Sequence, residues 1–125
     1  MNIVMLDSGQ LTGEVDFPEV DLDKFGWQQF VSLDDSEVED RCWRADIIIS
    51  TNTPVTAKVI NEAYKLRLII AAGETTEHID HAAAKARNIE VMNVSGLTGN
   101  DPHSTETICN KVVEQINHWL KNQEA

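Results

Sequence analysis

Two histidines, His78 and His81, stand three residues apart in the sequence, with the acidic residues Glu77 and Asp80 beside them. On one turn of a helix that spacing brings two imidazoles together, and imidazole and carboxylate groups are ligands for zinc. The competing interpretation is a helix start, because acids in a first turn are stabilised by the helix dipole. An alanine-rich segment follows, so we favour the helix start and predict no metal site.

Other residues able to do chemistry lack the partners that the chemistry needs. His103 is the best-placed candidate for a general acid, but no carboxylate can be paired with it from the sequence, and a surface histidine is the simpler interpretation. Ser95 lacks the G-x-S-x-G context of an activated serine. Cys42 and Cys109 are too far apart in the sequence to suggest a metal pair, which is typical of buried free thiols. We therefore predict no catalytic residue in the chain.

The elements that must position any site follow an alternating pattern. Short, β-branched apolar runs alternate with helix-length amphipathic segments, which is typical of parallel strands joined by helices. The clearest strands are 46–50 and 66–71, because continuous apolar runs suit strands covered on both faces. Residues 8–23 are mostly loop with one helical turn. Further strands are predicted at 3–6, 30–33 and 89–94, and helices over 35–44, from Thr56, from His78 to Asn88, and from a cap at Ser104 or Thr105.

The last predicted helix has one apolar stripe, so it packs on one side only. Its members are Ile108, Val112, Val113, Ile116, Trp119 and Leu120. Trp119 is expected to cover one sheet face together with Trp27 and Trp43. Five strands, crossovers of sufficient length and no long linker predict an α/β protein with a flavodoxin-like three-layer fold. Its five-stranded parallel sheet would form a single domain over residues 1–125.

The charge balance excludes several classes of partner. The 125 residues contain 10 Lys and Arg against 21 Asp and Glu, a net charge of −11. Such a surface repels phosphate backbones and anionic lipids, so we expect neither nucleic acid nor membrane partners. The sequence opens on a strand-like apolar run without a basic leader region, and no apolar run approaches the roughly 20 residues of a membrane span. A cytoplasmic location is the resulting expectation.

Several spaced segments share the order of a known family. They are A-D-I-I-I-S at 45–50, P-V-T at 54–56, L-I-I-A-A-G at 68–73, H-I-D at 78–80, A-A-A-K-A-R-N-I at 82–89 and V-M-N-V-S-G at 91–96. In this order the chain resembles the substrate-binding (catalytic) domain of the D-isomer-specific 2-hydroxyacid dehydrogenases, most closely the glycerate dehydrogenase branch. The resemblance is good over 45–96 and loose over 1–44, and several spaced features are more specific than one short motif.

The resemblance implies a domain that works with a second one. In the family a flavodoxin-like substrate domain is paired with an inserted Rossmann domain that holds NAD. The G-x-G-x-x-G fingerprint, the catalytic Arg and Glu and the general-acid His all belong to that inserted domain, and none can be located here. We therefore expect no cofactor in this chain. It is interpreted as a truncated substrate-domain homologue that is unable to catalyse NAD-dependent hydride transfer alone.

The resemblance also implies a binding loop at Gly73, Glu74, Thr75 and Thr76. In relatives the backbone N–H groups of this loop receive the substrate carboxylate, so the expected ligand is a small 2-hydroxy or 2-oxo acid. Thr75 stands where the family has its second glycine, and Glu74 where it has a small or apolar residue. We expect the Cβ of Thr75 to be penalised at positive φ and the charge of Glu74 to weaken anion binding.

An interaction role is the alternative function. Relatives bury an aliphatic helix between their two domains, whereas the last helix here carries polar residues such as Glu114 and Lys121 that suit a solvated surface. The chain would then act as a regulatory module without ligand, as a homodimer or as the partner of a full-length dehydrogenase. A separate chain that supplies the Rossmann domain is a further alternative. The sequence leaves these readings open beside acid binding.

Overall fold

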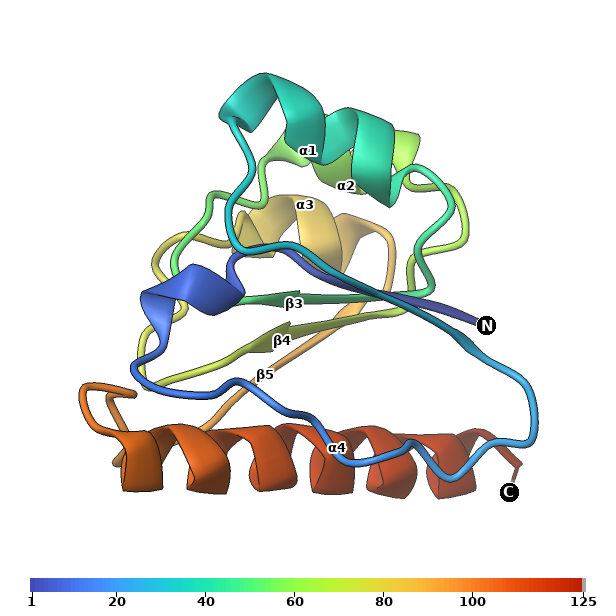
Figure 1. Ribbon diagram of the computed structural model, residues 1–125. Coiled ribbons are helices and arrows are strands. Elements are labelled where there is room, and N and C mark those ends of the chain that lie inside the picture. The colour runs from blue at the N-terminus through green and yellow to red at the C-terminus, as the bar shows by residue number, and fades with distance from the viewer. Residues whose placement is uncertain (125) are drawn as a thin grey trace.

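Five short strands form one parallel sheet at the centre of the molecule (Figure 1). In the computed structural model, which describes residues 1–124, the sheet has the strand order β2-β1-β3-β4-β5 and every neighbouring pair is parallel. This is the order of flavodoxin-like doubly wound sheets, so the predicted α/β class is confirmed. The strands are β1 (Asn2–Met5), β2 (Gly26–Gln29), β3 (Ile47–Ser50), β4 (Leu68–Ala71) and β5 (Glu90–Asn93).

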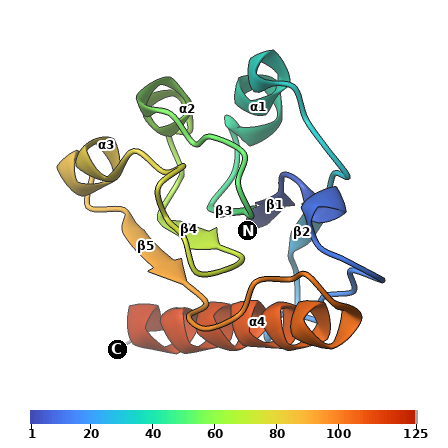
Figure 2. The same ribbon diagram turned by 90° about the vertical axis from the view of Figure 1, so that its left-hand side faces the viewer.

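Helices cover both faces of the sheet and give three layers (Figure 2). On one face lie α1 (Asp35–Cys42), α2 (Ala57–Glu62) and α3 (His81–Ala86), and on the other lies the long α4 (Pro102–Glu124). Every residue of β3 and β4 is buried, as expected of strands covered on both sides. Their side chains alternate between two apolar clusters, with Ile48 in the cluster under α1 to α3 and Ile49 in the cluster under α4.

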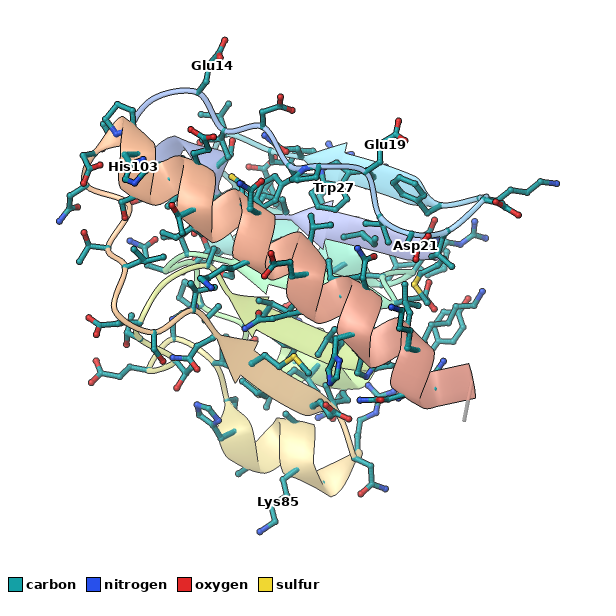
Figure 3. The ribbon with its side chains drawn as sticks, turned by 90° about the horizontal axis from the view of Figure 1, so that it is seen from below. Glu14, Glu19, Asp21, Trp27, Lys85 and His103 are labelled. Atoms are coloured by element: carbon teal, nitrogen blue, oxygen red, sulfur yellow. The ribbon has the colours of Figure 1, made fainter. Side chains whose placement is uncertain are left out.

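A loop replaces a helix in the first connection. A single 3₁₀ turn at Ser8–Gln10 follows β1, and the predicted loop then runs alongside α4 (Figures 1 and 3). Its apolar residues Leu11 and Val20 are buried in the cluster under α4, where the rings of Phe17 and Trp27 lie 5.1 Å apart. The loop therefore covers part of this face of the sheet, as a helix does in the other connections.

Two element predictions are wrong in position. The second strand is Gly26–Gln29, not 30–33, because its position is set by ladder bonds with β1, while Phe30 and Leu33 pack against the cluster under α1 to α3. The third helix begins at His81, after the cap residue Asp80, whose carboxylate accepts a bond from the N–H of Ala83 at 3.0 Å. The stretch before it, including His78, is a turn.

The start of α4 and the tryptophans also differ from the prediction. Asp101 caps α4 through the N–H of Ser104 at 2.9 Å, while the hydroxyls of Ser104 and Thr105 bond to Gly99. Trp119 and Trp27 share the cluster under α4, but Trp43 lies at the end of α1 and is 45% exposed, so the three do not cover one face. The stripe of α4 is confirmed. None of the helices described over residues 1–124 is long and apolar enough to span a membrane.

Arg87 ties the α3 layer to the end of α2. Its guanidinium donates to the carbonyls of Ile60, Ala63 at 3.0 Å and Tyr64 at 3.1 Å, which lie in the last turn of α2 and in the segment that directly follows it. We expect Arg87→Ala to lower the free energy of unfolding by about 2 kcal/mol, since these acceptors lose a charged donor. Urea unfolding followed by circular dichroism checks this. Lys85→Ala, on the exposed side of the same helix (Figure 3), should change stability by less than about 0.5 kcal/mol, and an equal effect of the two changes would contradict the capping role.

Candidate functional site

The carboxyl ends of the strands meet at one edge of the sheet, where ligands bind in doubly wound folds. Because all five strands are parallel, the segments that follow β1, β3, β4 and β5 lie together there. Hydrogen bonds join them directly: the N–H of Val94 donates to the carbonyl of Gly73 at 3.0 Å, and the segment after β1 bonds to the segment after β3. Residues 73–76, which we call the 73–76 loop, lie in this cluster.

Asp7 holds the first two of these segments in place. Its side chain is 1% exposed and accepts four bonds from the segment after β3: from the N–H groups of Thr51 at 2.8 Å, Asn52 at 2.9 Å and Thr53 at 2.9 Å, and from the Thr53 hydroxyl at 2.7 Å. The carboxylate fills a concavity of successive N–H groups, the arrangement that binds anions. Sequence reasoning missed this residue, although an acid directly after a buried apolar strand is the signal that could have found it.

The 73–76 loop is anchored through its carbonyl groups. The carbonyl of Gly73 accepts from Val94, that of Glu74 accepts from the Asn93 side chain at 2.9 Å, and that of Thr76 accepts from Ile79 at 3.1 Å. No acceptor for the N–H groups of residues 73–76 is found within residues 1–124. Gly73 is buried, and an unpaired backbone N–H in a buried residue is uncommon. Four successive N–H groups of the loop are therefore without an acceptor in this part of the chain.

The two departures from the family pattern behave differently. Among residues 1–124 only Asn88 has a positive φ outside glycine, so Thr75 does not adopt the conformation that would penalise its Cβ, and that expectation is wrong. The Thr75 hydroxyl accepts from the N–H of Glu77 at 3.2 Å and stabilises the turn. Glu74 is exposed, and its carboxylate accepts from the N–H of Gly96 at 3.3 Å. One negative charge therefore does stand beside the loop.

The histidines turn to different backbone carbonyls. Nε2 of His78 lies 3.2 Å from the carbonyl oxygen of Ser50, and Nε2 of His81 lies 3.0 Å from that of Thr76, so each nitrogen donates a proton to an oxygen. In the part of the chain that the structure describes, no group of three or more His, Cys, Asp or Glu side chains could hold a metal ion. His103 is exposed at the start of α4 (Figure 3).

The segments at this edge carry no basic side chain of fixed charge, and neither cysteine of the chain is a reactive thiol. The segments 6–12, 50–56, 72–80 and 94–101 contain no Lys or Arg, so an anion at the loop would be held by backbone N–H groups. Both cysteines are buried and free, as predicted. Burial raises the pKa of the Cys42 thiol to about 12 and that of Cys109 to about 11, so both stay protonated at neutral pH.

Comparison with known proteins connects this fold to one group of enzymes. Residues 10–125 match the family model described as the catalytic domain of D-isomer specific 2-hydroxyacid dehydrogenases. A protein of Haemophilus influenzae described as a 2-hydroxyacid dehydrogenase is 24% identical over 124 residues, which is 98% of this chain and 39% of that protein. D-3-phosphoglycerate dehydrogenase of Homo sapiens is 36% identical over 67 residues, 54% of this chain and 12% of that enzyme.

A solved structure shows the same fold. The 3-phosphoglycerate dehydrogenase of Entamoeba histolytica, determined with NAD⁺ bound, superposes with a TM-score of 0.59 at 21% identity. The superposition covers 74% of this chain and 32% of that one. The chain thus spans well under half the length of these relatives.

Proposed function

Because the chain belongs to the D-isomer specific 2-hydroxyacid dehydrogenase family, we propose that these 125 residues bind a small 2-hydroxy or 2-oxo acid at the 73–76 loop and transfer no hydride by themselves. The observation that carries the proposal is the set of four successive N–H groups without an acceptor within residues 1–124, at the edge where this sheet type binds ligands. The hydrogen bonds that the carbonyls of the same loop accept hold its backbone in place.

The chemistry of these donors suits a carboxylate. An N–H that donates to an anion makes a shorter and stronger bond than it makes to a neutral acceptor, and a backbone donor loses no side-chain entropy on binding. The Thr75 hydroxyl accepts from Glu77, which leaves its own proton free to donate to the acid. With Glu74 nearby and no Lys or Arg at this edge, we expect binding in the millimolar range, about −4 kcal/mol.

The residues present do not fit a nicotinamide dinucleotide. A dinucleotide places its pyrophosphate at a helix N-terminus behind a glycine-rich turn. Here carboxylates stand at three of those termini: Asp34 and Glu37 at α1, Asp80 at α3 and Asp101 at α4. The remaining one, at α2, is capped by Thr56. These acids would repel a pyrophosphate, so hydride transfer is assigned to no residue of this chain.

Isothermal titration calorimetry with glyoxylate tests the proposal. We expect saturable binding by the wild-type chain, and binding about threefold to tenfold tighter by Glu74→Gln at low salt, because the change removes a like charge next to the anion. Glu19→Gln, which removes an exposed charge on the loop along α4 (Figure 3), is the matched control and should leave the affinity unchanged.

The same preparation, given NADH together with glyoxylate, should show no change in absorbance at 340 nm. Steady oxidation of NADH by the purified chain would contradict the second half of the proposal, and an absence of any saturable heat would contradict the first.

A further inference from the structure

A second candidate site lies at the opposite edge of the sheet. A pocket of about 500 Å³ opens at the amino-terminal ends of β1 and β2, below the end of α1. It exists because Gly26 has no side chain and Trp27, the next residue of β2, turns to the other face of the sheet, which leaves this side of the strand uncovered. The polar residues that line it are Asn2, Gln28, Asp40, Arg41 and Arg44, and Trp43 lines it with them.

Two arginines of this pocket have no partner for their charge. Arg41 lies in the last turn of α1, and Arg44 follows the cap residue Trp43 just beyond the helix, and both line the pocket. Neither guanidinium makes an ion pair or a hydrogen bond within residues 1–124, although the chain carries 21 acidic residues. Asp40 also lines the pocket, but because neither guanidinium is bonded to it, both have donors available for an external anion.

Aromatic rings hold both guanidinium groups. That of Arg44 lies over the ring of Trp43, 4.6 Å from its centroid, and that of Arg41 lies 5.4 Å from the centroid of Phe30. A guanidinium stacked on a ring is fixed in its plane, and its N–H edge stays free for a bidentate bond to an oxyanion. Less entropy is then lost when an anion binds.

We propose that this pocket binds a small oxyanion, a carboxylate or a phosphate, between Arg41 and Arg44. Gln28, whose side chain makes no hydrogen bond within residues 1–124, adds an amide donor. Asp40 and the carbonyl end of α1 lower the local electrostatic potential, which weakens anion binding. The two guanidinium charges outweigh the one carboxylate, and the affinity for the anion falls as the salt concentration rises. The site is independent of the 73–76 loop, because it uses other residues at the other edge of the sheet.

Titrations of ¹⁵N-labelled protein with inorganic phosphate and, separately, with citrate test the proposal. We expect saturable shifts of the Trp43 indole and the Gln28 side-chain amide, and at least tenfold weaker binding by the double variant Arg41→Gln/Arg44→Gln. The double variant Lys111→Gln/Lys121→Gln removes the same charge from the exposed side of α4 and should bind as the wild type does.

The two probes separate the sources of the anion. Binding of phosphate alone assigns the pocket to phosphorylated ligands, and binding of citrate alone assigns it to carboxylates. Either result supports the site if the arginine variant loses it. The proposal is overturned if neither probe gives saturable shifts at these residues, or if the two double variants weaken binding equally. An unchanged unfolding midpoint of Arg41→Gln/Arg44→Gln shows that a loss of binding is not a loss of fold.

Discussion

Replacing Asp7 by alanine is expected to lower the free energy of unfolding by about 3 to 5 kcal/mol, the largest effect we expect of a single polar substitution in this chain. Four bonds converge on its buried carboxylate, and the N–H and hydroxyl donors of Thr53, which is itself buried, lose their acceptor when it is removed. Each buried donor left unpaired costs about 1 to 3 kcal/mol. Urea unfolding, with the slope compared between variants, measures the change.

Two further variants separate this role from a general effect of charge. Thr53→Val removes only the hydroxyl that donates at 2.7 Å and should cost about 1 kcal/mol. Glu19→Ala removes an exposed acid and should stay within about 0.5 kcal/mol of wild type. If Asp7→Ala unfolded at the same urea concentration as Glu19→Ala, the Asp7 carboxylate would not be what joins the segments after β1 and β3.

Replacing Thr75 by proline is expected to weaken glyoxylate binding at least tenfold. Proline has no N–H, so one of the four donors of the 73–76 loop is lost, and the ring also restricts the backbone of Glu74. A bond from an N–H to an anion contributes about 1.5 to 3 kcal/mol, which corresponds to tenfold or more in affinity. Calorimetric titration with glyoxylate measures the loss. Thr75 is exposed, so we expect the fold to persist.

Thr75→Ala is the matched control because it keeps the backbone N–H and removes only the hydroxyl. It should bind glyoxylate within about threefold of wild type, since the bond from Glu77 belongs to the turn and one neutral donor is a small part of the contact. Equal losses in the proline and alanine variants would assign binding to the hydroxyl and contradict the backbone account.

The buried strands could be predicted because their continuous apolar runs fit only strands that are covered on both faces. Apart from Ser50, the runs at β3 and β4 are apolar, and only a strand covered on both faces buries every residue of such a run. Edge strand β2 carries no such signal: Gly26, Trp27, Gln28 and Gln29 show no apolar alternation, and β1 fixes their position through the backbone ladder. The apolar residues Phe30 and Leu33 led to the prediction of a strand over 30–33, but they lie in a loop and pack against the core from there.

Helix starts could be predicted only where one capping residue was available. Thr56 accepts from the N–H of Val59 at 3.3 Å, as the sequence indicates. At α4 three residues compete, and Asp101 caps the helix with Pro102 at its first position, an arrangement that the fixed φ of proline favours. The hydroxyls of Ser104 and Thr105 are bonded to Gly99 instead, a contact between loop and helix that no local pattern contains.

The candidate site could be located through the family resemblance, but the hydrogen bonds within it could not be predicted from the sequence. Family order alone pointed to residues 73–76, while the bonds that anchor their carbonyl groups come from Asn93 and Val94, about 20 positions away. Asp7 and its partners are 44 to 46 residues apart, so the parallel sheet must form before the contact exists. Arg41 and Arg44 were passed over for the same reason, because only the structure shows that they line a pocket.

Acid binding at the 73–76 loop is tested by a titration of the ¹⁵N-labelled chain with glyoxylate, read at each backbone amide. We expect saturable downfield shifts of the N–H groups of Gly73, Glu74, Thr75 and Thr76, with smaller changes at the neighbouring segment after β5. Amides in these positions that stay unmoved up to about 50 mM glyoxylate would contradict it. So would shifts confined to the pocket of Arg41 and Arg44, which would place acid binding at the other edge of the sheet.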